Sequence, residues 1–110
     1  MAAIDAATFV ELQATAGADF VRDLVDTFLE EAPPMLAELR DALASSRIDA
    51  FRRAAHSLKS NASTFGALTL AAMARDLELQ GPGAATPAAL AALAAQYDAV
   101  AAELKALRDA

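Results

Sequence analysis

The sequence contains no cysteine, and it has only four glycines, four prolines and one histidine in 110 residues. The absence of cysteine excludes disulfide bonds and metal sites built from thiolates. Residues with β-branched side chains are sparse, whereas alanine, the residue with the highest helix propensity, is abundant. This composition predicts a helical protein. The length suits a single domain, residues 1–110, that buries enough surface to fold without a metal or a disulfide.

The sequence also lacks a segment that is long and apolar enough to span a membrane. The alanine-rich stretch 84–102 comes closest, but Pro87, Gln96 and Asp98 interrupt it. The N-terminus does not have the basic and then apolar order of a signal peptide. Nine Lys and Arg residues against fifteen Asp and Glu residues give a net charge of −6, which repels nucleic acids and anionic lipids. We therefore expect a cytoplasmic protein that binds neither a membrane nor nucleic acid.

Hydrophobic residues that recur every three or four positions predict helices, and capping residues mark where these helices begin and end. Asp5 and Thr86 are typical N-caps, and Pro87 follows Thr86 at the first helical position. Gly17 ends the first helix, and Gly66 suits the left-handed residue that follows a helix. The predicted helices span residues 6–15, 19–44, 48–65, 67–80 and 87–108.

A pair of prolines, Pro33 and Pro34, falls inside the second of these helices. Phe20, Leu24 and Phe28 recur every four residues before the pair, and an apolar pattern resumes after it. Because two adjacent prolines remove two backbone donors, we expect a kink within one long helix. The alternative is that the pair separates two helices.

Apolar stripes run along three of the long helices. In the third and the last helix the stripe residues are spaced alternately by three and four positions. The expected inward-facing residues are Ile48, Phe51, Ala55, Leu58, Ala62 and Phe65 in the third helix, Leu70, Met73, Ala74 and Leu77 in the fourth, and Leu90, Leu93, Tyr97, Val100, Leu104 and Leu107 in the last. Four long amphipathic helices with short connections predict an all-α fold, namely an antiparallel up-and-down four-helix bundle with an additional short N-terminal helix at one end.

The single histidine, His56, lies in the middle of the third predicted helix. At about 100° of rotation per residue, it falls roughly 130° from the centre of the apolar stripe and therefore on the solvent side. Four polar residues share this strip of helix surface with His56: Arg52, Lys59, Ser60 and Ser63. Position alone makes His56 a surface residue, so its neighbours must indicate whether it has a function.

The surroundings of His56 suit a phosphorylated imidazole. An imidazole is a good nucleophile at neutral pH, and a phosphoryl group on its ring nitrogen stays reactive enough to be passed on. Lys59, one helical turn from His56, can offset part of the added negative charge, and Arg52 can do the same from one turn in the other direction. Residues 47–59 include four basic side chains and one acidic side chain. This local basic patch complements a partner whose site is built of carboxylates and magnesium.

The segment 54–78, which reads AAHSLKSNASTFGALTLAAMARDLE, resembles the histidine phosphotransfer (HPt) family of multistep phosphorelays. The pattern of that family is a histidine, two residues, a lysine and small residues, then a glycine ten positions after the histidine and an apolar helix that ends in Leu-Glu. The matching residues in this sequence are His56, Leu58, Lys59, Gly66, Ala67, Leu70, Leu77 and Glu78. Residues 20–43 are similar to the second helix of the family, so the resemblance covers about residues 19–107.

The resemblance implies roles for individual residues. His56 would accept the phosphoryl group, Lys59 would lie beside that group, and Gly66 would shape the turn between the third and fourth helices. Candidate contacts to the phosphoryl group or to a partner are Arg52, Ser60 and Ser63. Ser60 is a departure, because the family usually has glycine directly after the lysine. A hydroxyl at this position can either hydrogen-bond the phosphoryl group or crowd the approach of the partner.

The resemblance also implies partners and a mechanism. The partners would be receiver domains of hybrid histidine kinases and response regulators: one receiver aspartate supplies the phosphoryl group, and another removes it. The partner would supply the metal, so this chain would need no cofactor and no metal of its own. It would be a monomeric carrier without enzymatic activity, and its docking face would combine the polar strip with exposed apolar residues of the second helix.

Three other interpretations are weaker. An independent enzyme would need a catalytic partner for His56, but Asp49 is two turns away along the helix, and no Glu-x-x-His pair is present for a di-metal site. An interaction module of the same fold would bind a receiver or a kinase without phosphotransfer, yet it need not keep the pair of His56 and Lys59. A dimerising kinase fragment would build its bundle from two hairpins, whereas this chain supplies four helices itself.

Overall fold

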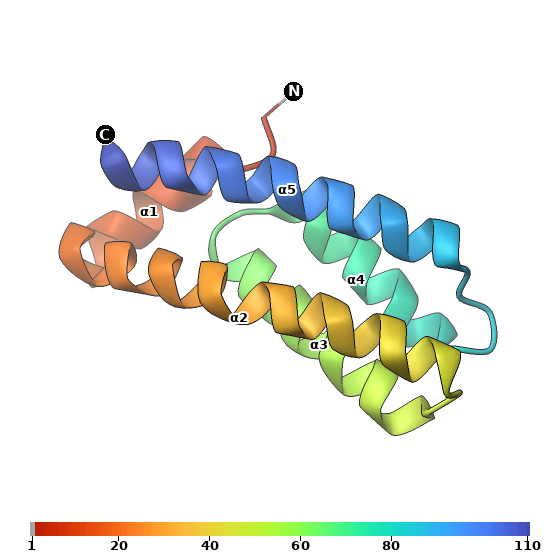
Figure 1. Cartoon of the computed structure of the whole chain (residues 1–110). Coiled ribbons are helices and arrows are strands. Elements are labelled where there is room, and N and C mark those ends of the chain that lie inside the picture. Colours follow the sequence, from red (N-terminus) through yellow and green to blue (C-terminus); the bar gives the residue numbers. More distant parts are fainter. Residues whose placement is uncertain (1) are drawn as a thin grey trace.

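The computed structural model describes residues 2–110, which form five helices. These are α1 (Ala6–Ala16), α2 (Ala18–Ala44), α3 (Ile48–Thr64), α4 (Leu68–Gln80) and α5 (Pro87–Asp109). Helices α2 to α5 form an antiparallel four-helix bundle, and α1 lies at the end of the bundle where α2 begins and α5 ends (Figure 1). The predicted all-α bundle with a short additional N-terminal helix is therefore confirmed.

The N-terminal caps of α1 and α5 have the expected geometry. The Asp5 carboxylate accepts a hydrogen bond of 3.1 Å from the backbone N–H of Thr8, and hydrogen bonds from Thr8 lower the pKa of Asp5. The Thr86 hydroxyl accepts a bond of 3.1 Å from the backbone N–H of Ala89, with Pro87 at the first helical position. These side chains supply acceptors for backbone donors that have no partner within the helix.

Gly66 shapes the connection between α3 and α4. Its φ of 79° is in the left-handed region, and the backbone N–H groups of Gly66 and Ala67 donate to the carbonyls of Ser63 and Ala62 at 3.1 and 2.9 Å. This pair of bonds is the Schellman pattern that ends many helices. A Cβ atom on Gly66 would lie 2.8 Å from the Cβ of Thr8, so the close approach of α1 also requires glycine here.

Helix α2 runs without interruption through Pro33 and Pro34, so the alternative of two separate helices is wrong. Both prolines are exposed on the surface of α2. The carbonyls that would have accepted from their missing N–H groups can therefore bond to water or adjust locally. The two missing hydrogen bonds still predict a bend of the helix axis at this point.

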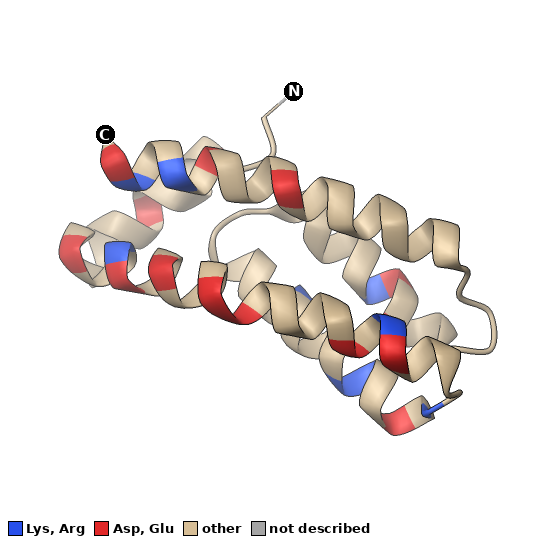
Figure 2. Ribbon diagram, viewed as in Figure 1, with Lys and Arg blue, Asp and Glu red and all other residues tan. Residues whose placement is uncertain are grey.

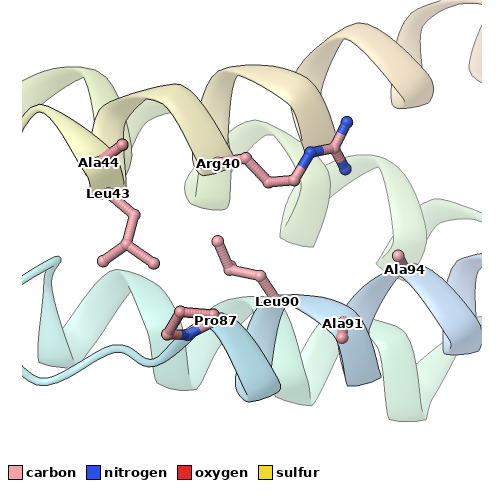
Figure 3. A pocket seen from close by; sticks show the side chains of 7 residues that line it. All are labelled: Arg40, Leu43, Ala44, Pro87, Leu90, Ala91 and Ala94. Atoms are coloured by element: carbon pink, nitrogen blue, oxygen red, sulfur yellow. The ribbon is translucent and has the colours of Figure 1, made fainter.

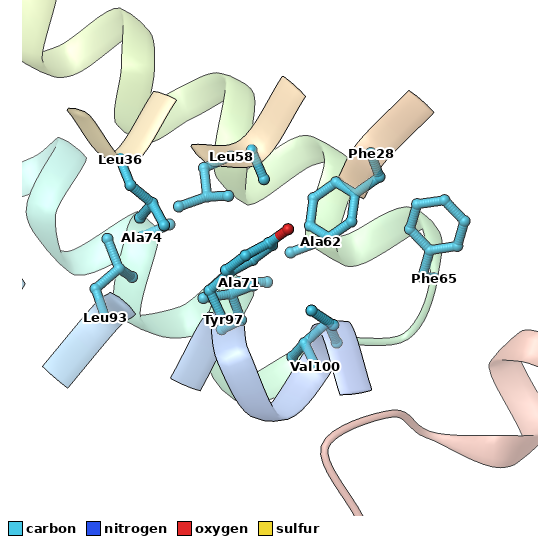
Figure 4. Packing of buried hydrophobic residues seen from close by; sticks show 14 of the residues in the cluster. Phe28, Leu36, Leu58, Ala62, Phe65, Ala71, Ala74, Leu93, Tyr97 and Val100 are labelled. Atoms are coloured by element: carbon cyan, nitrogen blue, oxygen red, sulfur yellow. The ribbon is translucent and has the colours of Figure 1, made fainter. Parts of the chain in front are cut away.

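One continuous hydrophobic core fills the bundle, and its end is closed by Phe9 of α1 and by Ile4, which precedes α1. The ring centroids of Phe28 and Phe65 are 5.5 Å apart, and the ring of Tyr97 meets Phe28 edge-on at 5.8 Å (Figure 4). Leu58 points into the middle of this packing and is fully buried. Most of the apolar stripes predicted from the sequence are therefore in the core.

Some apolar residues that the stripes predicted to face inward do not. Ile48 is 53% exposed because it is the first residue of α3 and lies beyond the last layer of the core. Phe20, near the start of α2, is 55% exposed, whereas Val21, about 100° further around the helix, is buried. Met73 and Leu107 are only half-buried. Met73 and Leu107 still pack against the core, so the stripes predict the buried side of each helix but not how deeply each residue is buried.

An apolar hollow of about 320 Å³ lies between the end of α2 and the beginning of α5 (Figure 3). Its lining residues are Arg40, Leu43, Ala44, Pro87, Leu90, Ala91 and Ala94. None of these side chains is a nucleophile, and Arg40 is the only charged residue in the lining. This hollow therefore has no chemistry that would make it a catalytic site. None of the helices within residues 2–110 combines the length and apolar character of a membrane span.

Candidate functional site

His56 lies in the middle of α3, and its side chain is 57% exposed. Ala55, Leu58 and Ala62 on the same helix are buried in the core, so helical periodicity turns His56 toward solvent. The predicted polar strip is found at the surface, where Arg52, Ser60 and Ser63 are all exposed and Lys59 is half-buried.

Glu78 on α4 reaches across to both His56 and Lys59. One of its carboxylate oxygens, Oε2, is 2.8 Å from Nδ1 of His56, and the other, Oε1, accepts a hydrogen bond of 3.0 Å from Nζ of Lys59. The side chains of Glu78 and Lys59 are 24% and 28% exposed, which is much less than that of His56. The three residues thus form one contact between α3 and α4 that leaves the imidazole at the surface.

The pKa of Glu78 is lowered from its ordinary value. The largest cause is the hydrogen bond from Lys59; partial burial opposes it, and the bond and charge of His56 add to it. Glu78 is therefore ionised at neutral pH and acts only as a hydrogen-bond acceptor.

An ionised Glu78 also determines how the imidazole presents its two nitrogens. Because the carboxylate can only accept, Nδ1 of His56 must carry the proton and donate it to Glu78 at 2.8 Å. In the neutral ring the lone pair then belongs to Nε2. This nitrogen is the one available to attack an electrophile that a second protein brings to the surface.

A shallow depression beside His56 is lined by Asp49, Arg52, Arg53, His56 and Glu78. The guanidinium of Arg52 lies against Gly81 at the C-terminal end of α4, where an added Cβ atom would be 3.3 Å from Nη2. A cation is favoured there by the carbonyl groups that end the helix. In Figure 2 the acidic residues are concentrated along α2, whereas α3 carries several basic ones. Of the basic residues predicted to form a patch, Arg52 and Arg53 lie beside His56 in this depression, where Asp49 and Glu78 offset their charge.

The predicted serine contacts occupy the same exposed face of α3. The Thr64 hydroxyl donates a hydrogen bond of 3.1 Å to the backbone carbonyl of Ser60, so the Ser60 side chain takes no part in this bond. Ser60 and Ser63 follow Lys59 along the helix and are both exposed. Their hydroxyls are therefore accessible to a docked protein. Within residues 2–110 no group of three or more His, Asp or Glu side chains is placed to hold a metal ion.

The sequence did not reveal what Glu78 contacts. It was noted only as part of a family pattern, because no spacing rule connects residue 78 with residues 56 and 59 on another helix. A short turn at Gly66 and antiparallel packing of α3 on α4 are the signals from which this contact might have been inferred. Even these signals do not fix the rotation of α4 about its own axis, on which the position of the carboxylate depends.

Comparisons with known proteins agree with this geometry. The model of the family described as "Hpt domain" matches residues 23–109. A solved structure, that of histidine-containing phosphotransfer protein B (HptB) from Pseudomonas aeruginosa PAO1, superimposes with a TM-score of 0.87 at 28% sequence identity. The match covers 96% of this chain and 94% of that chain. A search of curated proteins gives no match.

Proposed function

The chain belongs to the Hpt-domain family, and we propose that it carries a phosphoryl group on His56 from the aspartate of one receiver domain to that of another. The observation that carries this proposal is the exposed imidazole whose Nδ1 is held by Glu78 at 2.8 Å. This arrangement leaves Nε2 free at the surface of a helix whose other side is packed in the core. Residues 1–110 would act as one domain and as a carrier, with no catalytic activity of their own.

The transfer step needs no proton to leave the ring. The lone pair of Nε2 attacks the phosphorus of the aspartyl phosphate, an N–P bond forms, and the P–O bond to the aspartate breaks with its electron pair going to the receiver carboxylate. The ring then carries a positive charge with its proton still on Nδ1, and the Glu78 carboxylate at 2.8 Å offsets that charge. In the second transfer, the aspartate of another receiver attacks the phosphorus, and the ring leaves as neutral imidazole.

Lys59 would stabilise the phosphoryl group from the side of α3. Its ammonium can donate three hydrogen bonds, so the bond of 3.0 Å to Glu78 leaves donors for the oxygens of the phosphoryl group. Further contacts to the group or to the partner would come from Arg52, Ser60 and Ser63. The receiver would supply the metal, and this chain, acting as a cytoplasmic monomer, would supply the imidazole and its positioning.

A panel of purified receiver domains tests this function. Each receiver is phosphorylated on its aspartate with a radioactive label and mixed with the full chain. We expect the label to appear on the chain for at least one receiver and then to pass to a second one. The linkage should be stable to base and labile to acid, as a phosphohistidine is and an aspartyl phosphate is not. If no receiver transfers label, the proposed function is wrong.

We expect the variant Lys59→Ala to fold normally and to accept the phosphoryl group about tenfold more slowly, which corresponds to roughly 1.4 kcal/mol of transition-state stabilisation. The reason is that Lys59 donates to the group only during transfer, while its bond to Glu78 is partly exposed and contributes little to stability. Initial rates of label transfer and a thermal melt followed by circular dichroism measure the two properties. Lys105→Ala, on the exposed surface of α5, is the matched control. Loss of the cooperative melt in Lys59→Ala would show instead that Lys59 is a structural residue.

A further inference from the structure

The apolar hollow between α2 and α5 has the volume and the lining of a small-molecule site. Its volume of about 320 Å³ is at the lower end of the range for ligand pockets, roughly 300–1,000 Å³, and about twice that of a cavity that binds benzene. Apart from Arg40, the lining consists of leucine, alanine and proline side chains. Leu90 is buried and Leu43 packs against the core, so an apolar group in the hollow would extend the core outward.

One cation, the guanidinium of Arg40, lies at the edge of this hollow. Arg40 is exposed, and no carboxylate within residues 2–110 forms an ion pair with it. In Figure 3 its side chain extends along α2 toward the end of the hollow where Ala94 lies, whereas Leu43 and Pro87 lie at the other end. This direction is expected, because long side chains on a helix lean toward its N-terminus. The hollow therefore combines an apolar surface with a positive charge at one end.

Other charges near the hollow weaken the potential around Arg40 but do not pair with it. Asp41 is turned about 100° away around α2, and Asp98 lies one turn beyond Ala94 on α5. Neither of these acidic residues lines the hollow. Helix α2 ends and α5 begins beside the hollow, so the opposite dipoles of the two helix ends offset each other there. The N–H groups of Arg40 are thus the main feature that would select the charge of a ligand.

A carboxylate on an apolar chain matches both parts of the hollow. The planar guanidinium of an arginine can bind a carboxylate through two parallel hydrogen bonds. Pro87 and Ala94 are seven residues apart in the sequence, which separates them by roughly 10 Å along α5. The alkyl chain of octanoate has a similar length. A ligand of this kind would place its charge beside Arg40 and its chain on the apolar side chains.

The hollow lies on the side of the bundle opposite His56. His56 meets Glu78 where α3 packs against α4, whereas the hollow lies between α2 and α5. A protein docked on His56 would therefore leave the hollow open. Because the lining comes from two helices that are distant in the sequence, only the folded bundle presents it, and a ligand bound there would stabilise the fold.

We propose that the hollow between α2 and α5 binds a medium-chain monocarboxylate, whose carboxylate pairs with Arg40 and whose chain lies against Leu43, Pro87 and Leu90. This site is separate from the proposed phosphoryl carrier His56, and it requires no phosphotransfer. The chain would thus have a second surface, one that recognises a small apolar anion.

Octanoate is the probe, added to the full chain and followed by isothermal titration calorimetry and by NMR chemical shifts of the backbone amides. We expect a dissociation constant below about 1 mM, with the largest shifts at the residues that line the hollow. At about ten times this concentration the midpoint of thermal melting should rise by about 5 °C. Octanol, which lacks the charge, and acetate, which lacks the chain, should each bind at least about fivefold more weakly.

Two pairs of variants test the two parts of the site. Arg40→Gln should weaken the binding of octanoate about tenfold, whereas Arg75→Gln, which removes an exposed cation from α4, should change it less than about twofold. Ala91→Leu should fill part of the hollow and weaken binding about tenfold, whereas Ala92→Leu, at an exposed residue of α5 outside the lining, should not. All four changes are at exposed residues, so the variants should melt within a few degrees of the unmodified chain.

The inference is overturned if the dissociation constant of octanoate exceeds about 1 mM, if the shifts gather away from the hollow, or if the variants and their controls bind equally well. An equal affinity for octanol would also overturn it, because the guanidinium would then have no part in recognition. None of these measurements involves phosphotransfer, so the inference and the proposed function of His56 fail separately.

Discussion

The variant His56→Gln should accept no label from any phosphorylated receiver, while its thermal melt stays close to that of the unmodified chain. His56 is the only histidine in the sequence, so no second imidazole can substitute for it. Glutamine can still donate a hydrogen bond to Glu78, and the side chain it replaces is 57% exposed, so little packing is lost. The expected loss of transfer is complete because an amide nitrogen has no lone pair available for attack on phosphorus.

Receiver binding separates this result from a defect in docking. We expect His56→Gln to bind the same receivers as the unmodified chain, within about a factor of three, since a single exposed side chain contributes little to an interface of ordinary size. Isothermal titration calorimetry with the unphosphorylated receiver measures this. Unchanged transfer of label by the variant would eliminate His56 as the carrier. If the unmodified chain itself bound receivers but was never labelled, the protein would be an interaction module.

The variant Leu58→Asp should not fold into the bundle. Leu58 has no exposed surface and packs in the middle of the core, two residues from the exposed imidazole. Removing its side chain alone would cost about 3 kcal/mol, and burying a carboxylate without a partner adds several more. Together these are comparable with the whole stability of a domain this size, about 5–15 kcal/mol. Circular dichroism should therefore show no cooperative melt.

Ser57→Asp is the matched control for this variant. It introduces the same charge one position earlier on α3, at an exposed residue, and we expect its midpoint of melting to stay within a few degrees of that of the unmodified chain. A cooperative melt of Leu58→Asp close to that of the unmodified chain would contradict the orientation of α3 in the bundle. Because His56 and Leu58 face opposite ways on one helix, that outcome would also remove the reason for placing the imidazole at the surface.

Much of the fold could be predicted because local rules determine it. The caps at Asp5 and Thr86 and the left-handed Gly66 were recognised from single residues, since each satisfies backbone groups within a few positions of itself. Most residues of the apolar stripes were also placed correctly in the core. Ile48 was assigned wrongly because periodicity gives the direction of a side chain but not where the neighbouring helices stop.

The candidate site also has one part that could be predicted from local rules and another part that could not. The exposure of His56 follows from the rotation of a single helix, so the sequence was enough to predict it. The contact of Glu78 with His56 and Lys59 requires the distance and rotation between two helices, which depend on how the whole core packs.

Because Glu78 belongs to α4 while the ring belongs to α3, the proposed nucleophile is oriented from a neighbouring helix. The direction in which Nε2 points then depends on the packing between the two helices as much as on His56 itself. Substitutions at this helix interface that shift α4 by a fraction of an ångström would alter the speed of the proposed reaction as well as the stability of the bundle. Natural variation among the small buried residues of α4 therefore offers a way to adjust a carrier to faster or slower signalling without altering any residue that touches phosphorus.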